Sequence, residues 1–373
     1  MNDHLTSSQQ STDLPFGLPE NVPQLASLYI YAAGSCNLAC RHCWIVPKFQ
    51  PNGNGGPYIK LETVEKIVRE GKGLGLRTVK LTGGEPLMNP QIRDIISLID
   101  DAGLSIMIET NGILVDASMA EFLKSKSHVD FISISLDGSN AETHDGLRSV
   151  PGSFDQAVRG IKNLVEVGFH PQVICTLHRG NSRQMEEVIN FAAELGCGSV
   201  KFNNLQSAGR GEGFMRDAGL STAEIVDLYK HLENDIIPTR PLPIHFDIPF
   251  AFHPVRRFLQ DSLGKCAVLN ILGVLSTGEL ALCGIGTTIP ELVYGHADTD
   301  DLRDVWCNAA GLINLRETVP FKMDGVCGRC IHRDFCLGTC VANNYHVAGR
   351  LDAPFSFCDQ AEKLGMFPSS RIR

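Results

Sequence analysis

The chain has 373 residues, of which 42 are acidic and 33 are Lys or Arg, giving a formal net charge of -9. This length suits two ordinary domains or one large barrel with an extension. Hydrophobic residues make up 43% and charged residues 20%, so the bulk of the chain is neither disordered nor fibrous. The acidic balance argues against a nucleic-acid partner, because affinity for phosphate is mainly a cationic term.

The 13 cysteines are the most informative part of the composition. The N-terminus is polar and lacks the apolar core of an export signal, which argues against secretion and against a disulfide framework. No apolar run reaches the roughly 18 residues that span a bilayer, so no membrane association is expected. We therefore expect a cytoplasmic, reducing setting in which clustered cysteines bind metal or carry redox chemistry.

The first half of the chain predicts an α/β fold. Residues 1–26 are rich in Ser, Gln, Pro and Asn and are expected to form a mobile lead-in. From residue 27 to 205, apolar runs alternate with amphipathic stretches of helical period, and six such units predict a partial (β/α)6 barrel similar to an incomplete TIM barrel. The predicted strands are 28–33, 78–82, 104–109, 130–136, 172–177 and 199–203, and the predicted helices lie near 61–73, 90–102, 116–125, 154–166 and 182–194.

The pattern changes after residue 205. A connecting segment over 206–259 contains a Gly-rich stretch at 208–213, a predicted helix near 222–237 and a Pro-rich stretch. From 260 to 373 the chain is rich in Cys and Gly and its regular elements are short. This composition predicts a small Cys-rich α+β domain with a C-terminal tail.

Polar residues and glycines follow four predicted strands, at the barrel end where chemistry is usually found. The first strand leads to Cys36, the second to Thr82-Gly83-Gly84-Glu85-Pro86, the third to residues 109–112 and the fourth to Ser135-Leu136-Asp137-Gly138. A turn that needs a positive φ explains any one of them. Four such exits on one rim indicate a binding site.

Cys36, Cys40 and Cys43 form a C-x3-C-x2-C motif after the first strand. Three thiolates can bind three irons of a [4Fe-4S] cube and leave the fourth iron open to another ligand. A zinc site is the alternative, but zinc requires a fourth ligand. His42 lies directly beside Cys43, where simultaneous ligation would be strained.

These motifs resemble those of the radical S-adenosylmethionine (radical SAM) enzymes. The resemblance covers about residues 27–205, because the cysteine motif, the Gly-Gly-Glu exit and the Ser-Leu-Asp-Gly exit come in the expected order on consecutive units. It implies that the amino and carboxylate groups of S-adenosylmethionine (SAM) chelate the open iron. It also implies that Gly83, Gly84 and Glu85 receive the methionine ammonium, Ser135 and Asp137 face the ribose, and Arg148 binds the methionine carboxylate, with Asn111 and Asn181 as further polar candidates.

Seven later cysteines resemble the SPASM extension of peptide- and protein-modifying radical SAM enzymes. The spacing fits over about residues 260–360, including the C-x2-C-x5-C-x3-C run from Cys327 to Cys340. The resemblance implies two auxiliary [4Fe-4S] clusters, so three clusters in all. Their ligands would be Cys266, Cys283 and Cys340 for the first and Cys327, Cys330, Cys336 and Cys358 for the second.

The first auxiliary cluster has only three assigned cysteines. Cys307 could supply a fourth ligand, although a small buried thiol explains that residue as well. The other alternative is an open iron that binds a substrate thiolate. Two cross-braced zinc ions are an alternative for this region alone, and Cys175 and Cys197 are expected to be packing residues.

The resemblance implies an oxidoreductase that reductively cleaves SAM to a 5'-deoxyadenosyl radical, which abstracts hydrogen from a substrate. We expect modification of a ribosomal peptide or protein through a thioether or another crosslink, because an open auxiliary iron could ligate a substrate cysteine. The alternative is an enzyme acting on a small molecule such as a haem or tetrapyrrole precursor. Anaerobic sulfatase maturation is less favoured, because Gly284 follows Cys283 where that subfamily has an Asp base. A non-catalytic electron-transfer scaffold would have no use for the SAM-binding rim.

The expected partners are a peptide or protein substrate and a flavodoxin- or ferredoxin-type electron donor. Only about 26 residues precede the barrel, too few for a leader-binding domain, so a separate leader-binding protein is an option. Acid and base residues are not assigned. The polar candidates are Asp247, His253, Glu279 and Asp324 near the domain join and His178-Arg179 at the barrel mouth.

Overall fold

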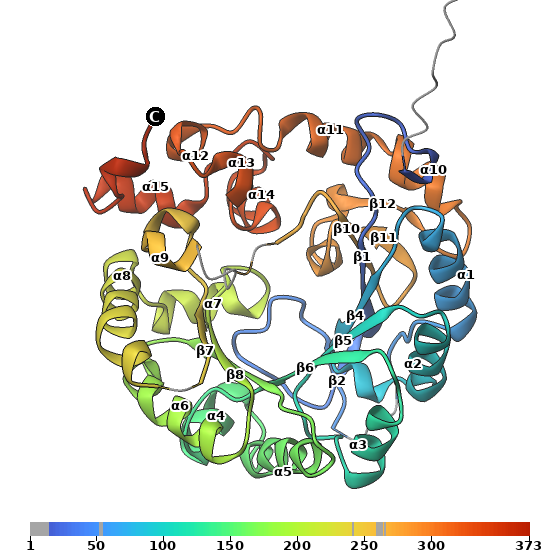
Figure 1. Cartoon of the computed structure of the whole chain (residues 1–373), viewed down its shortest axis with the longest axis horizontal. Coiled ribbons are helices and arrows are strands. Elements are labelled where there is room, and N and C mark those ends of the chain that lie inside the picture. The colour runs from blue at the N-terminus through green and yellow to red at the C-terminus, as the bar shows by residue number, and fades with distance from the viewer. Residues whose placement is uncertain (1–14, 52–54, 241, 259–263, 265) are drawn as a thin grey trace, which may run out of the picture.

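The computed structural model describes residues 15–51, 55–240, 242–258, 264 and 266–373 of the chain. Its strands form one large curved sheet and one short pair, with helices around the outside of the curve (Figure 1). The strands of the described residues are β1 (Ser27–Ala33), β2 (Ser35–Cys36), β3 (Lys48–Phe49), β4 (Thr78–Gly83), β5 (Ser105–Thr110), β6 (Val129–Ser135), β7 (Gln172–Leu177), β8 (Ser199–Asn204), β9 (Ile244–Phe246), β10 (Ile271–Val274), β11 (Glu279–Ala281) and β12 (Val293–His296).

The large sheet is an incomplete barrel. Within the described residues its strands follow the order β12-β11-β10-β1-β4-β5-β6-β7-β8-β9. The six strands β1, β4, β5, β6, β7 and β8 pair in parallel with their neighbours, which requires crossover connections that helices supply here. The predicted α/β partial barrel is confirmed, and each of these six strands begins and ends within one residue of its predicted limits.

The helices bury apolar stripes against the outer face of the sheet. In α2 the residues Ile92, Ile95, Ile96 and Ile99 recur at helical spacing and are all buried. Each such side chain contributes about 1.5–3 kcal/mol through burial. Within the described part of the chain, no helix is long and apolar enough to cross a membrane. The helices are α1 (Leu61–Lys72), α2 (Ile92–Asp101), α3 (Ala117–Lys124), α4 (Ala141–Arg148), α5 (Ser153–Glu166), α6 (Met185–Glu194), α7 (Arg210–Ala218), α8 (Thr222–His231), α9 (Val255–Phe258), α10 (Leu302–Asn308), α11 (Ala310–Thr318), α12 (Gly325–Arg329), α13 (Arg333–Cys336), α14 (Val341–Ala348) and α15 (Ser356–Lys363).

Both edges of the sheet are built by the chain beyond residue 205. Strand β9 comes from the Pro-rich stretch and pairs in parallel with β8. Strand β10 pairs in parallel with β1 at the other edge, and β11 and β12 extend it as antiparallel strands. These short strands carry no βα period, so the sequence pattern did not predict them. The sheet therefore crosses the domain limits proposed at residues 205 and 259.

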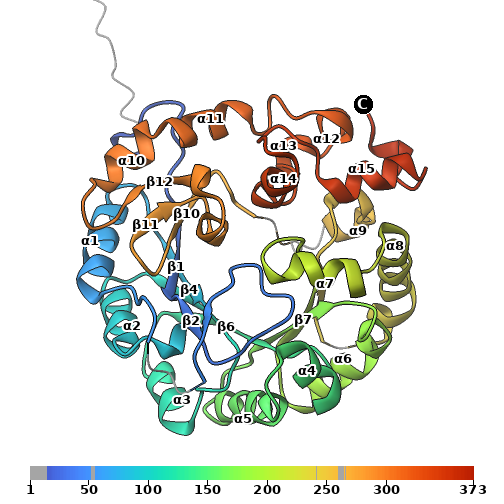
Figure 2. The same cartoon turned by 180° about the vertical axis from the view of Figure 1, so that it is seen from behind.

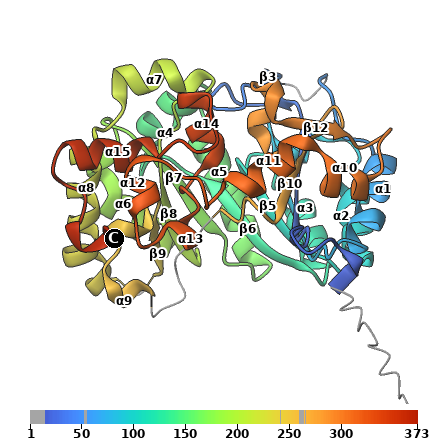
Figure 3. The same ribbon diagram turned by 90° about the horizontal axis from the view of Figure 1, so that it is seen from above.

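The Cys-rich C-terminal region lies along one side of the barrel. Helices α10 to α15 run between β12 and α9 (Figures 1 and 2). Seen from above, α7 and the loop around β3 lie at the same end of the barrel (Figure 3). The C-terminal region thus covers the side on which the sheet does not close.

The described part of the predicted mobile lead-in packs against the protein. Leu25 is completely buried, and the Trp306 indole N–H on α10 donates a hydrogen bond of 2.8 Å to the Pro23 carbonyl. These contacts hold residues 15–26 in place, because apolar side chains among the polar ones reach the core. Residues 1–14 of the lead-in lie outside the described residues.

Candidate functional site

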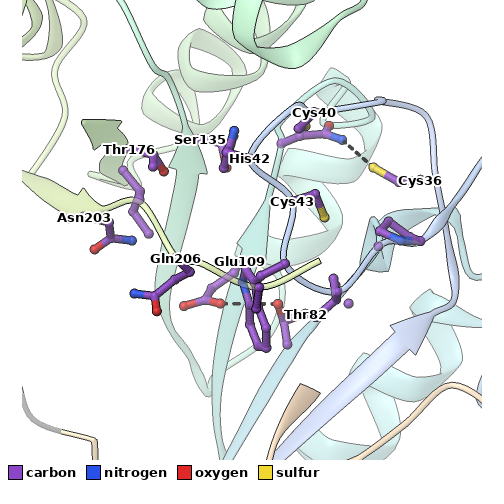
Figure 4. A pocket seen from close by; sticks show the side chains of 18 of the residues that line it. Cys36, Cys40, His42, Cys43, Thr82, Glu109, Ser135, Thr176, Asn203 and Gln206 are labelled. Carbon is purple, nitrogen blue, oxygen red and sulfur yellow. Dashed lines mark hydrogen bonds between the residues drawn. The ribbon is translucent and has the colours of Figure 1, made fainter. Parts of the chain in front are cut away.

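A cavity of about 410 Å³ lies at the C-terminal ends of the barrel strands. Its volume falls in the range of small-molecule sites, about 300–1,000 Å³. Cys36 and Cys43 lie on one side of it, and Asn203 and Gln206 lie on the other (Figure 4). The C-terminal region also contributes to the lining, so the cavity joins segments about three hundred residues apart in sequence. The cysteines that line it are Cys36, Cys40, Cys43, Cys283 and Cys340.

The first cysteine motif lies in the loop between β2 and β3. The thiols of Cys36 and Cys40 are buried, and Cys43 is partly exposed. The Cys36 sulfur accepts hydrogen bonds from the Leu38 backbone N–H at 3.4 Å and from Asn111 Nδ2 at 3.8 Å. Burial raises the pKa of both buried thiols, because the interior disfavours a bare thiolate. A bound cationic centre would reverse that preference.

The arrangement of these thiols fits an iron-sulfur cube better than a zinc ion. Zinc needs four ligands at about 2.0–2.3 Å from a single point, and within the described residues no three His, Cys, Asp or Glu side chains converge in this way. A [4Fe-4S] cube binds each thiolate through a different iron, so its ligands stand apart. Cys36, Cys40 and Cys43 line one cavity, and their role as cluster ligands stays a prediction.

The Gly-Gly-Glu exit of β4 lies directly along the cluster loop. The Gly84 N–H donates to the Ala33 carbonyl at 2.8 Å, and the Glu85 N–H donates to the Ser35 carbonyl at 2.9 Å. A Cβ atom at Gly84 would lie 2.0 Å from the Ser35 carbonyl oxygen, and Gly83 has a φ of 128°. Only glycines allow this approach, which places Gly83 and Gly84 in the cavity wall.

Glu85 is buried at the floor of the cavity. Its carboxylate accepts hydrogen bonds from Thr110 Oγ1 at 2.7 Å, the Asn111 N–H at 2.8 Å and the Leu87 N–H at 3.1 Å. Burial raises its pKa, because no cation within hydrogen-bond distance balances the charge. A carboxylate held in this way can receive an ammonium group from a ligand in the cavity.

Asp137 and Arg148 form a buried ion pair. Arg148 Nε donates to Asp137 Oδ2 at 2.5 Å, and the Thr176 N–H donates to Asp137 Oδ1 at 2.8 Å. Burial alone would raise the pKa of Asp137, but Arg148 and His42 hold it at about 2. Ser135 and Arg148 line the cavity, whereas Asp137 lies behind them. Asp137 was predicted to face the ribose, but its side chain does not line the cavity, and its carboxylate is already paired with Arg148.

Arg148 reaches the cavity because it ends helix α4, which the sequence pattern did not predict. This helix is short and carries few apolar residues. The one sequence feature that indicates the start of this helix is Asn140, a favoured N-cap residue, whose side chain accepts a hydrogen bond from the Thr143 N–H at 3.0 Å. From there Arg148 Nη1 donates to the Cys40 sulfur at 3.5 Å.

The weaker candidates divide between cavity and scaffold. Asn111 lines the cavity and donates to Asn37 Oδ1 at 2.7 Å. Asn181 instead donates to the carbonyl groups of Asp137 and Thr176, each at 2.9 Å, and so braces the backbone behind the cavity.

His178-Arg179 also lies outside the cavity lining. His178 packs edge-on against Phe214, and Arg179 pairs with Glu224 on the surface at 3.1 Å. Among the polar candidates at the domain join, Asp247 lines the cavity, and burial raises its pKa. His253 is buried and bonded to Tyr229, Glu279 lines a neighbouring hollow, and Asp324 is paired with Arg350.

The sequence reasoning missed Lys201 and Asn203, which line the cavity, whereas Glu109 belongs to the predicted polar exit of the third strand and lines the cavity as well. Glu109 accepts from Lys80 Nζ at 2.9 Å, and burial would raise its pKa but for Lys80 and Lys201, which hold it below its ordinary value. Lys201 and Asn203 alternate along β8 on the inner face. Polar residues at every second position of an otherwise apolar strand were the signal for an inward-facing site.

The structure separates the seven later cysteines into two groups. Cys283 and Cys340 line the main cavity, and the pKa of the Cys283 thiol is raised by burial and, to a lesser extent, by the nearby Cys340 and Cys266. The other four surround a separate, smaller cavity, in which the Cys327 and Cys358 thiols are hydrogen-bonded to each other. These groups coincide with the two predicted ligand sets, Cys266, Cys283 and Cys340 on one side and Cys327, Cys330, Cys336 and Cys358 on the other. The number of auxiliary clusters stays a prediction.

The remaining cysteines lie elsewhere. Cys307 on α10 does not line the main cavity, and its charged neighbours include Arg303 and Arg316. Cys175 and Cys197 are buried in the apolar core.

Comparison with known proteins gives consistent matches. A model described as the radical SAM superfamily matches residues 30–192. An AdoMet-dependent heme synthase of Methanosarcina barkeri is 27% identical over 345 residues, which cover 88% of this chain and 94% of the relative. The mycofactocin maturase MftC of Mycobacterium tuberculosis is 27% identical over 346 residues, covering 87% of this chain and 81% of the relative.

Solved structures share the fold. Streptococcus suis SuiB bound to S-adenosylmethionine matches with a TM-score of 0.71 and 20% identity, covering 91% of this chain and 77% of SuiB. The protein anSMEcpe with bound AdoMet and a Cp18Cys peptide matches with a TM-score of 0.69 and 17% identity, covering 91% of this chain and 94% of anSMEcpe. From its motifs, its barrel and these relatives, the chain is a radical SAM enzyme related to SPASM-type maturases and to AdoMet-dependent heme synthases.

Proposed function

We propose that this enzyme cleaves SAM reductively to a 5'-deoxyadenosyl radical and uses it to modify a ribosomal peptide or protein, through a thioether or another crosslink. The observation that carries the proposal is the shared lining of one cavity by the Cys36–Cys43 loop and by Cys283 and Cys340. A substrate held there lies between the site of radical formation and a second group of thiols suited to iron. An electron released by the substrate thus has an acceptor site in the same wall.

The cluster and SAM supply the radical chemistry when bound. The residues of this chain bind, orient and shield the reactants. Glu85 would hold the methionine ammonium. Gly83 and Gly84, which lack side chains, would let SAM lie close to the Cys36–Cys43 loop, and the buried walls of the cavity would exclude water. Ser135 and Asn111 offer hydrogen bonds on the same rim.

The shape next to the cavity supports an elongated substrate. A second hollow of about 670 Å³ lies next to the main cavity, and both are lined by Ile45, Pro47, Gly83 and Gly84. It continues between the cluster loop and the β10–β11 turn. SuiB and anSMEcpe, which share the fold, have both been crystallised with peptides, and a peptide could lie across the two hollows here.

The alternative is a haem or tetrapyrrole precursor as substrate. It is favoured by the AdoMet-dependent heme synthase and by an Fe-coproporphyrin III synthase of Methanosarcina barkeri, which is 25% identical over 328 residues. A substrate with several carboxylates would need several free cations. In the described lining, Arg148 is already paired with Asp137, which leaves Lys201 and Arg210 as the cations without an ion pair beside the acidic Glu85, Glu109 and Asp247. A substrate with several carboxylates would meet more acidic than free basic groups, which favours the peptide.

The rest of the proposal concerns cofactors and partners. We propose three [4Fe-4S] clusters, a flavodoxin- or ferredoxin-type electron donor, a cytoplasmic setting that keeps the thiols reduced, and a separate leader-binding protein if the peptide carries a leader. Sulfatase maturation is disfavoured, because Gly284 lies where a base would be required.

The test offers both substrate classes to the anaerobically reconstituted, reduced enzyme. Short cysteine-containing peptides encoded beside its gene are incubated with SAM in one series, and Fe-coproporphyrin III in another, followed by mass spectrometry. Loss of hydrogen from a peptide together with 5'-deoxyadenosine formation supports the proposal. Conversion of the porphyrin, with every peptide unchanged, would establish the alternative.

A further inference from the structure

The second hollow, next to the main cavity, contains a single charged group in its described lining. It lies between the cluster loop and the β10–β11 turn. Its walls are mostly apolar, with Val46, Leu275 and Val293 among them, and Glu279 is the only charged residue of the described lining. A carboxylate alone among apolar walls gives the hollow a negative potential, which favours a cationic ligand.

The β10–β11 turn fixes the position of Glu279. The Leu275 N–H donates to the Glu279 carbonyl and the Gly278 N–H donates to the Leu275 carbonyl, each at 2.9 Å. Gly278 has a φ of 102°, and a Cβ atom there would lie 2.6 Å from the His296 ring, so the turn requires glycine. The Thr277 hydroxyl donates to the Glu279 carboxylate. The carboxylate is therefore held at the hollow before a ligand binds.

The described residues leave the charge of Glu279 without a cation. Thr277 is the side-chain partner of Glu279 among them, and no Lys or Arg pairs with it there. His296 lies opposite Glu279 on β12, but its Nε2 bonds the Thr277 carbonyl at 3.0 Å. Its Nδ1 accepts from the Asp298 N–H at 3.2 Å. Both ring nitrogens are thus engaged away from the carboxylate.

The chemistry of the hollow suits a Lys or Arg side chain. The methylene stem of such a side chain packs against apolar walls while its charged end reaches a carboxylate. The resulting charge-assisted hydrogen bond is stronger than a neutral one. A metal ion fits less well, because it needs several ligands, and no three His, Cys, Asp or Glu side chains converge within the described residues.

The hollow also lies at a useful distance from the main cavity. Gly83 and Gly84 line both spaces, and so does Ile45. Glu279 and Cys283 are four residues apart in the chain, which limits their separation to about 14 Å. About four residues of extended peptide cover the same distance.

We propose that Glu279 binds a Lys or Arg side chain of the substrate peptide, within about four residues of the position that meets the Cys283 wall. The inference rests on the proposed function and deepens it, because it names a feature by which the enzyme recognises its peptide. Glu279 would determine which peptide binds, and the radical chemistry would take place in the main cavity.

The experiment measures peptide affinity of the anaerobically reconstituted full chain, with SAM present, by fluorescence anisotropy. The probe is the acetylated peptide Lys-Ala-Gly-Leu-Cys-Gly with a dye at its C-terminus. A second probe carries norleucine in place of Lys, which keeps the alkyl stem and removes the charge. We expect the unaltered enzyme to bind the lysine peptide about ten times more tightly, and Glu279→Gln to remove this difference. The control Glu291→Gln, at an exposed side chain outside the hollow, should preserve it.

Reversal of the charge separates direct contact from damage to the hollow. Glu279→Lys should bind a third probe, with Glu in place of Lys, more tightly than the lysine peptide. Equal affinity of the unaltered enzyme for the lysine and norleucine probes, or binding of neither, would overturn the inference. So would a lysine preference that persists in Glu279→Gln, or equal weakening of all three probes in Glu279→Lys. Absence of 5'-deoxyadenosine formation by the unaltered enzyme would instead refute the proposed function.

Discussion

The buried pair of Asp137 and Arg148 gives a prediction whose magnitude follows from the structure. The Asp137 carboxylate is completely buried, and its pKa falls from an ordinary value of 3.8 to about 2. Since one pKa unit corresponds to about 1.4 kcal/mol, the ionised carboxylate contributes about 2 kcal/mol to stability. Replacement by Asn also leaves Arg148 charged and unpaired in the interior, which raises the expected cost to about 3–5 kcal/mol.

The pH dependence has a definite sign. A depressed pKa means that the unfolded state binds the proton more readily than the folded state. The contribution is therefore complete above about pH 4 and is lost as the pH falls through about 2. Asp137→Asn should remove this part of the acid dependence.

The assay is urea unfolding of the reconstituted enzyme followed by circular dichroism. The control is Asp227→Asn, because Asp227 is exposed and its ion pair with Lys230 is long, at 3.9 Å. This substitution should change the free energy of unfolding by less than about 0.5 kcal/mol. In a double-mutant cycle, the variant carrying both Asp137→Asn and Arg148→Gln should lose less stability than the two single variants lose together, because the two residues contact each other. Equal unfolding midpoints for the two Asn variants would refute the reasoning.

Three further predictions concern the rim and the clusters. Gly84→Ala should abolish SAM cleavage, because its Cβ would lie 2.0 Å from the Ser35 carbonyl oxygen, whereas Gly146→Ala, with open space around it, should retain cleavage; an active Gly84→Ala would contradict the described contact. Glu85→Gln keeps the shape and removes the charge, so calorimetry should give about tenfold weaker SAM binding, and unchanged affinity would exclude the ammonium contact. Cys330→Ala should lower iron by about four atoms per chain while SAM still binds, and undiminished iron would remove Cys330 from the ligand set.

The parts of the fold that repeat were predictable from the sequence. Strand β7 is a short, nearly continuous apolar run, and helix α2 carries apolar residues at helical spacing, so the local pattern is sufficient for both. Strands β9 and β10 were not predictable, because they are short and depend on pairing with residues far away in the chain. Helix α4 was missed because it has almost no apolar stripe and is fixed by its cap and by the Asp137–Arg148 pair.

The site shows the same division. The Cys36–Cys43 motif is local, and its spacing alone predicted that these three thiols serve one site. The division of the later cysteines came from the resemblance to the SPASM extension, because Cys340 follows Cys336 in sequence but lines the main cavity with Cys283. The roles of polar residues depend on neighbours that the sequence does not order. Asp137 lies behind Arg148, and Arg210 reaches the cluster loop from about 170 residues away. Lys201 and Asn203 alternate with apolar residues along β8, which marks one polar face of the strand, but only the barrel shows that this face lines the cavity.

The central claim is that this chain generates the 5'-deoxyadenosyl radical at the Cys36–Cys43 loop. The most direct measurement is 5'-deoxyadenosine formation from SAM by the anaerobically reconstituted, reduced enzyme, compared with a variant in which Cys36, Cys40 and Cys43 are all replaced by Ala. The account predicts 5'-deoxyadenosine from the unaltered enzyme and none from the variant. No 5'-deoxyadenosine from an iron-loaded, reduced enzyme, or equal amounts from both proteins, would contradict it.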